Sequence, residues 1–166
     1  MSAIRVTSIT ASIVFFLSDS FIFFSLQTVS RYSETVISEY TGGNSGSQAS
    51  VTVIRGLSLN ELRFSDLAKV VWKEARVALL CGVTLAVCNY VKLMVIDRVT
   101  SPVATVLCIT LTATVFVAKI IGCSLPMLAK KIGFDPAVMA SPFITTIVDA
   151  ISLMIYFTIA TSVLGL

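Results

Sequence analysis

The last thirty-one residues of the chain, Pro136 to Leu166, form an apolar run with a single formal charge, Asp149. About 20 apolar residues are enough to cross a bilayer as an α-helix, so this run can span a membrane. An aspartate near the middle of such a helix costs roughly 2.5–3.5 kcal/mol on insertion scales. Residues of this kind usually face a bundle interior or a water-filled path, which makes an ion or proton site the default hypothesis. We therefore expect a membrane protein in which the contacts of Asp149 decide the function.

The composition extends this expectation to the whole chain. Of the 166 residues, 56% are hydrophobic and only 13% are charged, whereas soluble domains carry about a quarter charged residues. The length allows four or five spanning helices with short loops, and no separate soluble domain is expected. A net charge of +3 with scattered basic residues gives little support for nucleic-acid binding.

The sequence also argues against an enzyme and against a metal site built from cysteines. It contains no histidine, and no plausible nucleophile–base pair is visible. The four cysteines have no CxxC spacing and lie in apolar segments (Cys81, Cys88, Cys108 and Cys123). We interpret them as small packing residues rather than as a disulfide framework or a zinc site.

Five transmembrane helices are predicted within one domain that covers residues 1–166. Their approximate bounds are 4–29, 36–57, 66–96, 100–130 and 136–164. Residues 55–76 hold the densest group of charges and are interpreted as a solvent-side loop that leads into an amphipathic helix. The sequence GFDP at 133–136 predicts a turn, because a residue that precedes proline disfavours helix.

The distribution of lysine and arginine predicts the orientation in the cell membrane. Segments rich in basic residues stay on the cytoplasmic side, which places 55–76 and Lys130–Lys131 there. Segments 30–40 and 97–101 carry few basic residues and are expected outside. With five spans, the N-terminus is then cytoplasmic and the C-terminus lies outside.

A glycine-rich polar run, TGGNSGSQ at 41–48, falls inside the second predicted helix. Small residues allow two membrane helices to approach closely, which is one interpretation. Alternatively, the backbone unwinds there and exposes carbonyl oxygens, which suit Mg²⁺, Ca²⁺ or their water shells. Asn44 and Gln48 share one helical face and favour a polar lining.

The last helix carries polar side chains at separations of four, three and four residues: Thr145, Asp149, Ser152 and Tyr156. This spacing puts them on one face and suggests a water-facing path. The preceding helix has a weaker stripe of the same kind, formed by Thr105, Cys108, Thr112 and Lys119. A structural ion pair between Asp149 and Lys119 inside the bundle is the competing interpretation, beside an ion site or proton transfer at Asp149.

Two groups of residues resemble the MgtE magnesium transporter family. The first is GGNSGSQAS at 42–50, followed by VIRGL at 53–57. The second is GFDPA at 133–137, followed by SPFITTIVD at 141–149. The order and separation of the two groups also fit, and the resemblance covers residues 42–166.

The resemblance implies an all-α integral membrane protein, a homodimer of five-helix protomers with a pore between the subunits. It further implies passive movement of hydrated Mg²⁺, with Mn²⁺, Co²⁺ and Ca²⁺ as further candidate ions. The implied metal site consists of the carboxylate of Asp149, the backbone carbonyls of Gly43, Gly46 and Thr145, and a lining contribution from Asn44.

Two departures from the family pattern accompany the resemblance. The cytoplasmic N-terminal and CBS domains of typical members are not expected in this sequence. In addition, residues 30–40 are unusually polar, and Glu34 and Glu39 either concentrate cations at an outer mouth or are ordinary solvated charges.

Two rival functions stay open at this point. One is a divalent cation transporter coupled to Na⁺ or H⁺, in which Asp149 alternates between the two kinds of ion. The other is a non-conducting assembly subunit of the membrane, in which an Asp149–Lys119 pair fixes the helix packing.

Overall fold

The computed structural model describes residues 34–139 and 142–164, and this part of the chain is helical throughout, with short connecting turns and no strand. The predicted first helix, 4–29, lies outside the described residues. Four long helices are present: α2 (Glu34–Ser58), α3 (Leu67–Val95), α4 (Ser101–Lys131) and α5 (Pro142–Leu164). Two short 3₁₀ turns, η1 (Phe64–Asp66) and η2 (Pro136–Met139), precede α3 and α5.

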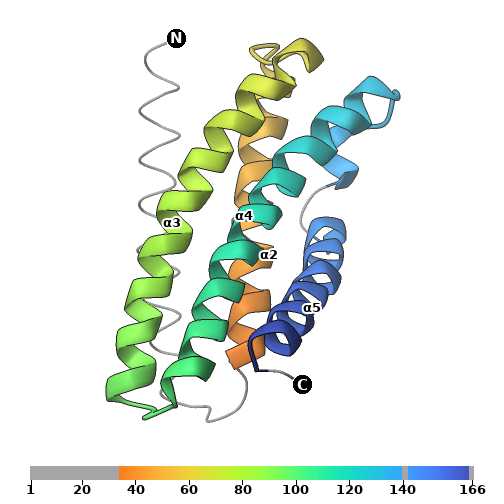
Figure 1. Cartoon of the computed structure of the whole chain (residues 1–166). Helices are drawn as coiled ribbons and strands as arrows, with labels where there is room; N and C mark the ends of the chain where they lie inside the picture. Colours follow the sequence, from red (N-terminus) through yellow and green to blue (C-terminus); the bar gives the residue numbers. More distant parts are fainter. Residues whose placement is uncertain (1–33, 140–141, 165–166) are drawn as a thin grey trace.

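Helix α4 is the centre of the bundle, because α2, α3 and α5 all pack against it (Figure 1). Helix α2 also contacts α5, whereas α3 and α5 lie on opposite flanks of α4. The sequence of α4 explains its position, since it has no charge before Lys119 and is buried along most of its length. This arrangement puts the glycine-rich helix against both α4 and the helix that carries Asp149.

Apolar side chains fix the three contacts of α4. Near the loop between α2 and α3, the core contains Ala49, Val53 and Leu57 of α2 with Cys123 and Met127 of α4. At the opposite end, α3 and α4 share a second cluster: Leu93, Ala104, Leu107 and Cys108. The contact with α5 joins Ala118 to Ile144 and Val148.

Three of the described helical segments have the length and composition to cross a membrane: Phe64–Val95, Ser101–Lys131 and Phe143–Val163. An all-helical membrane protein is therefore confirmed. Helix α2 is not among the three because its polar residues lower its hydropathy, although at 1.5 Å per residue it is about 37 Å long. Its buried polar side chains, Thr41, Ser45 and Ser50, are enclosed by the bundle.

Three expectations about local structure need correction. The helix α5 begins at Pro142 rather than near 136, because Asp135 accepts a hydrogen bond from the N–H of Ala137 (2.9 Å) and Pro136 opens the 3₁₀ turn η2. The charged segment 55–76 enters α3 at Leu67, close to the predicted start at 66, but its Glu74 is buried rather than on the solvent side. Finally, Cys88 is exposed, whereas Cys108 and Cys123 are buried in the core.

Candidate functional site

The glycine-rich run forms regular helix, so of the two interpretations the unwound backbone is wrong and close packing holds for α2. Its glycines serve close packing instead. A methyl group on Gly42 would lie 2.5 Å from Cγ2 of Thr114, and one on Gly122 would overlap the carbonyl oxygen of Gly46. The backbones of α2 and α4 therefore touch at Gly46 and Gly122, as small residues allow in membrane helices.

Gly43 faces α5 rather than α4. A methyl group at Gly43 would lie 3.2 Å from Cγ2 of Thr145 and 3.6 Å from Oδ1 of Asp149. Both side chains are half-buried, so they line the seam between α2 and α5 while one side of the seam stays open. The structure thus brings together three of the five residues expected at the metal site.

The other two residues are placed differently. Gly46 contacts α4 and Ile144, and its carbonyl oxygen lies against Gly122. Asn44 is half-buried on α2. Across residues 34–139 and 142–164, no group of three or more His, Cys, Asp or Glu side chains lies together. Asp149 is therefore a single carboxylate beside helix backbone.

Asp149 does not pair with Lys119, which corrects the expectation of a structural ion pair. Lys119 donates instead to Oε2 of Glu74 on α3 at 3.3 Å, and both side chains are almost fully buried. None of the salt bridges among the described residues includes Asp149. Its carboxylate is therefore available in the seam between α2 and α5.

Glu74 is the residue that the sequence interpretation missed, because it lies in the densely charged segment 55–76, which was expected on the solvent side. A helical signal was present. The buried positions of α3 repeat at separations of four, four, three, four and four residues: Glu74, Ala78, Gly82, Leu85, Asn89 and Leu93. This is the spacing of one helix face, so Glu74 belongs to the face that packs against α4.

The two polar stripes are largely packing surfaces. On α5, the Ser152 hydroxyl donates to the carbonyl of Val148 at 2.7 Å, and Tyr156 packs against the α3–α4 cluster. On α4, Thr112 donates to the carbonyl of Gly82 and Cys108 to that of Ala86. Ser152, Cys108 and Thr112 therefore take part in hydrogen bonds within and between the helices, whereas the Thr145–Asp149 part of the α5 stripe borders the open seam.

Pro126 is a further feature of α4 that sequence reasoning did not single out. It lies inside the helix, where a proline has no N–H to donate. The carbonyl of Gly122, four residues earlier, therefore lacks its usual helical donor. This carbonyl belongs to the residue that touches Gly46 on α2.

Comparison with known proteins gives a consistent result. The family model "MgtE: Divalent cation transporter" matches residues 35–159. Three similar proteins are each named "Magnesium transporter MgtE": those of Thermus thermophilus (34% identical over 124 residues), Enterococcus faecalis (32% over 120) and Bacillus subtilis (34% over 122). Each match covers 72% of this chain and 26% of the relative, so the chain spans about a quarter of the length of these relatives.

Proposed function

The chain belongs to the MgtE family of divalent cation transporters, and on that premise we propose that it forms a passive membrane pathway for Mg²⁺ with Asp149 at its ion site. The family consists of transporters rather than enzymes. The observation that carries the proposal is Asp149 itself, a carboxylate on a membrane-spanning helix with no basic partner among the described residues. A bound cation supplies the compensation that such a carboxylate requires.

The seam around Asp149 suits an ion that keeps its water. Mg²⁺ gives up water reluctantly and usually retains several water ligands when a protein binds it. A carbonyl oxygen has two lone pairs, so the helical carbonyls of Gly43 and Thr145 can accept a hydrogen bond from the hydrated ion beside their helical one. Because Gly43 has no side chain, Thr145 and Asp149 of α5 can lie close to this backbone.

Asn44 and Gly46 belong to the proposed site in secondary roles. The Asn44 side chain offers both an oxygen and an amide to the water shell of the ion. Gly46 keeps α2 close to α4 through its contact with Gly122. Because its carbonyl oxygen lies against Gly122, Gly46 contributes an oxygen to the ion less directly than Gly43 and Thr145.

We place the pathway between two copies of the chain. Asp149 and Thr145 are only half-buried, so one protomer encloses part of the site and leaves the rest open. A twofold axis beside α2 and α5 would bring two Asp149 carboxylates toward each other, and a divalent cation between them would relieve their repulsion. Light scattering on the solubilised protein tests this arrangement, which requires the mass of a dimer.

The orientation in the membrane is part of the proposal. The structure gathers the end of α2, the turn η1 and the end of α4 at one end of the bundle (Figure 1). This end carries Arg55, Arg63, Lys130 and Lys131, and we propose that it faces the cytoplasm.

The decisive experiment measures Mg²⁺ flux into proteoliposomes without any Na⁺ or pH gradient. We expect flux with the parent chain, loss of flux with Asp149→Asn, and normal flux with Asp135→Asn. The control makes the same chemical change in an exposed turn, where an asparagine oxygen can still accept from Ala137. Full flux with Asp149→Asn would contradict the proposed ion site.

The same assay distinguishes the rival functions. Flux that appears only with an imposed Na⁺ or pH gradient would indicate a coupled transporter. A non-conducting assembly subunit loses its main support, because its expected Asp149–Lys119 pair is replaced by Glu74–Lys119. An assembly subunit predicts no Mg²⁺ flux under any gradient. Competition by Mn²⁺, Co²⁺ and Ca²⁺ then ranks the ions.

A further inference from the structure

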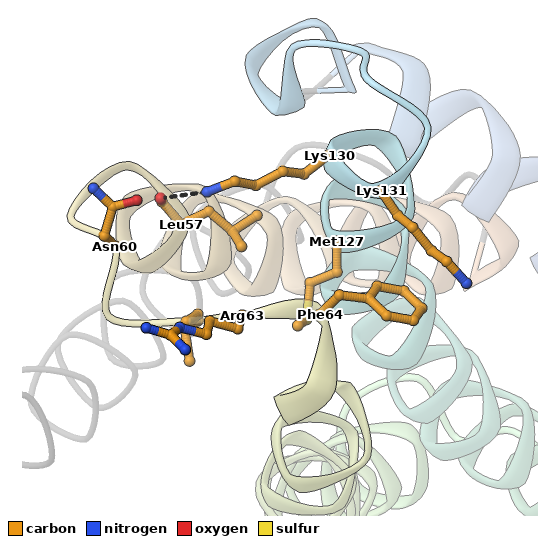
Figure 2. A pocket seen from close by; sticks show the side chains of 8 residues that line it. Leu57, Asn60, Arg63, Phe64, Met127, Lys130 and Lys131 are labelled. Carbon is orange, nitrogen blue, oxygen red and sulfur yellow. Dashed lines mark hydrogen bonds between the residues drawn. The ribbon is translucent and has the colours of Figure 1, made fainter.

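A cavity of about 380 Å³ lies at the end of the bundle where α2 stops and α4 finishes (Figure 2). Its walls combine three basic side chains, Arg63, Lys130 and Lys131, with apolar ones that include Phe64 and Met127. Among the described residues, none of the side chains that line it is acidic, and none belongs to the Asp149 seam. The cavity takes no part in the function proposed above.

Two of the three cations are held in place by neighbouring groups. Nζ of Lys130 donates to the carbonyl oxygen of Leu57 at the end of α2, at 2.8 Å (Figure 2). Nζ of Lys131 lies 4.3 Å from the ring centroid of Phe64, a cation–π contact. These contacts order the lysines without neutralising them, so the positive charge at the cavity is fixed before any ligand binds.

The nearby carboxylates do not cancel this charge. Among the described residues, none of the salt bridges includes Arg63, Lys130 or Lys131. Asp66, the nearest acidic residue in η1, accepts from Lys69 and from the backbone N–H of Arg63. The cavity therefore suits an anion, and an arginine with two lysines is typical of phosphate recognition.

The position of the cavity favours one source of the phosphate. The candidate membrane helix that contains α3 begins at Phe64, and the candidate membrane helix α4 ends at Lys131. The cavity thus lies at the ends of two such helices, where basic side chains of a spanning helix meet the headgroup region of a bilayer. Basic pockets between membrane helices at this level bind the headgroups of anionic lipids.

We propose that this cavity binds the phosphate headgroup of an anionic phospholipid such as phosphatidylglycerol. Arg63 and Lys131 contact the phosphate, while Phe64 and Met127 pack against the glycerol and the first part of the acyl chains. Lys130 contacts both the lipid and the last turn of α2. The lipid then joins α2, η1 and α4 at one end of the bundle.

Binding of phosphatidylglycerol to the purified full chain in phosphatidylcholine nanodiscs tests the proposal, with retained lipid counted by native mass spectrometry. A charge-assisted hydrogen bond to the phosphate contributes at least about tenfold in affinity, so Arg63→Gln/Lys131→Gln should weaken binding at least about 100-fold. The matched control, Arg55→Gln/Arg76→Gln, removes the same charge from positions outside the cavity and leaves the Asp66–Lys69 pair intact. It should weaken binding by at most about 30-fold, because each residue contributes only roughly fivefold through the general surface potential.

Two results would overturn the proposal. Equal losses in the two double variants would mean that the lipid responds only to the overall charge of this face. The second result is that millimolar inorganic phosphate displaces the lipid and raises the melting temperature of the protein as much as the lipid does. The cavity would then take a soluble phosphate instead. Lipid binding that resists phosphate and depends on Arg63 and Lys131 would support it.

Discussion

The buried pair between Glu74 and Lys119 gives the sharpest prediction about stability. The two side chains are 9% and 5% exposed, and one hydrogen bond of 3.3 Å joins them. Removing one partner of a buried pair leaves the other charge uncompensated, which typically costs about 3–5 kcal/mol. We therefore expect Lys119→Met and Glu74→Gln each to lower the free energy of unfolding by about 3 kcal/mol or more.

The double variant Glu74→Gln/Lys119→Met should recover part of this loss. Removing both charges leaves only an unpaired amide at position 74, so we expect the double variant to be about 1–3 kcal/mol less stable than the parent. The coupling energy from the double-mutant cycle is then at least about 3 kcal/mol. Unfolding in mixed micelles, followed by circular dichroism, measures all four proteins under one condition.

The pair Lys92–Asp97 serves as a matched control. Its atoms are closer, at 2.8 Å, but its side chains are 16% and 31% exposed. Solvent screens such a pair, so its coupling energy should be only about 0.2–1 kcal/mol. Additive effects at Glu74 and Lys119, with a coupling no larger than in the control, would refute the reasoning that burial makes this pair strong.

Two further predictions concern glycines of the packed seams. Gly122→Ala should lower the free energy of unfolding by about 1–3 kcal/mol, because its methyl group would meet the backbone oxygen of Gly46 and neither backbone can move alone; an unchanged melting temperature would contradict the close contact. Gly43→Ala should keep the melting temperature near that of the parent and reduce Mg²⁺ flux, because its methyl group would lie 3.6 Å from Oδ1 of Asp149; unchanged flux in proteoliposomes would argue against an ion at this seam.

The sequence predicts the helical membrane class because long apolar runs have few alternatives in a bilayer. The ends of α3 and α4 lie within a residue or two of their predicted positions, since charges and prolines mark them. The glycine run was ambiguous, because small residues serve both close packing and unwinding. Only the position of α4 against Gly42 and Gly46 distinguishes the two.

The partner of Lys119 could not be chosen by sequence separation. Asp149 lies in an apolar run and Glu74 in a charged segment. The choice between them depends on which neighbouring helix faces the Lys119 side of α4. Helix α4 presents Lys119 to α3 and Ala118 to α5, so adjacent residues serve different neighbours. The periodicity of the buried face of α3 contained this information, but the local density of charges concealed it.

Two contacts of α4 differ in how they can change during evolution. At Glu74 and Lys119, a substitution on one helix can be compensated by a second on the other, because the two side chains together can restore neutrality and volume. At Gly46 and Gly122 the contact is between backbones, and no exchange at one position makes room for a larger residue at the other. Compensating substitutions are therefore possible at Glu74 and Lys119, whereas Gly46 and Gly122 must each stay small.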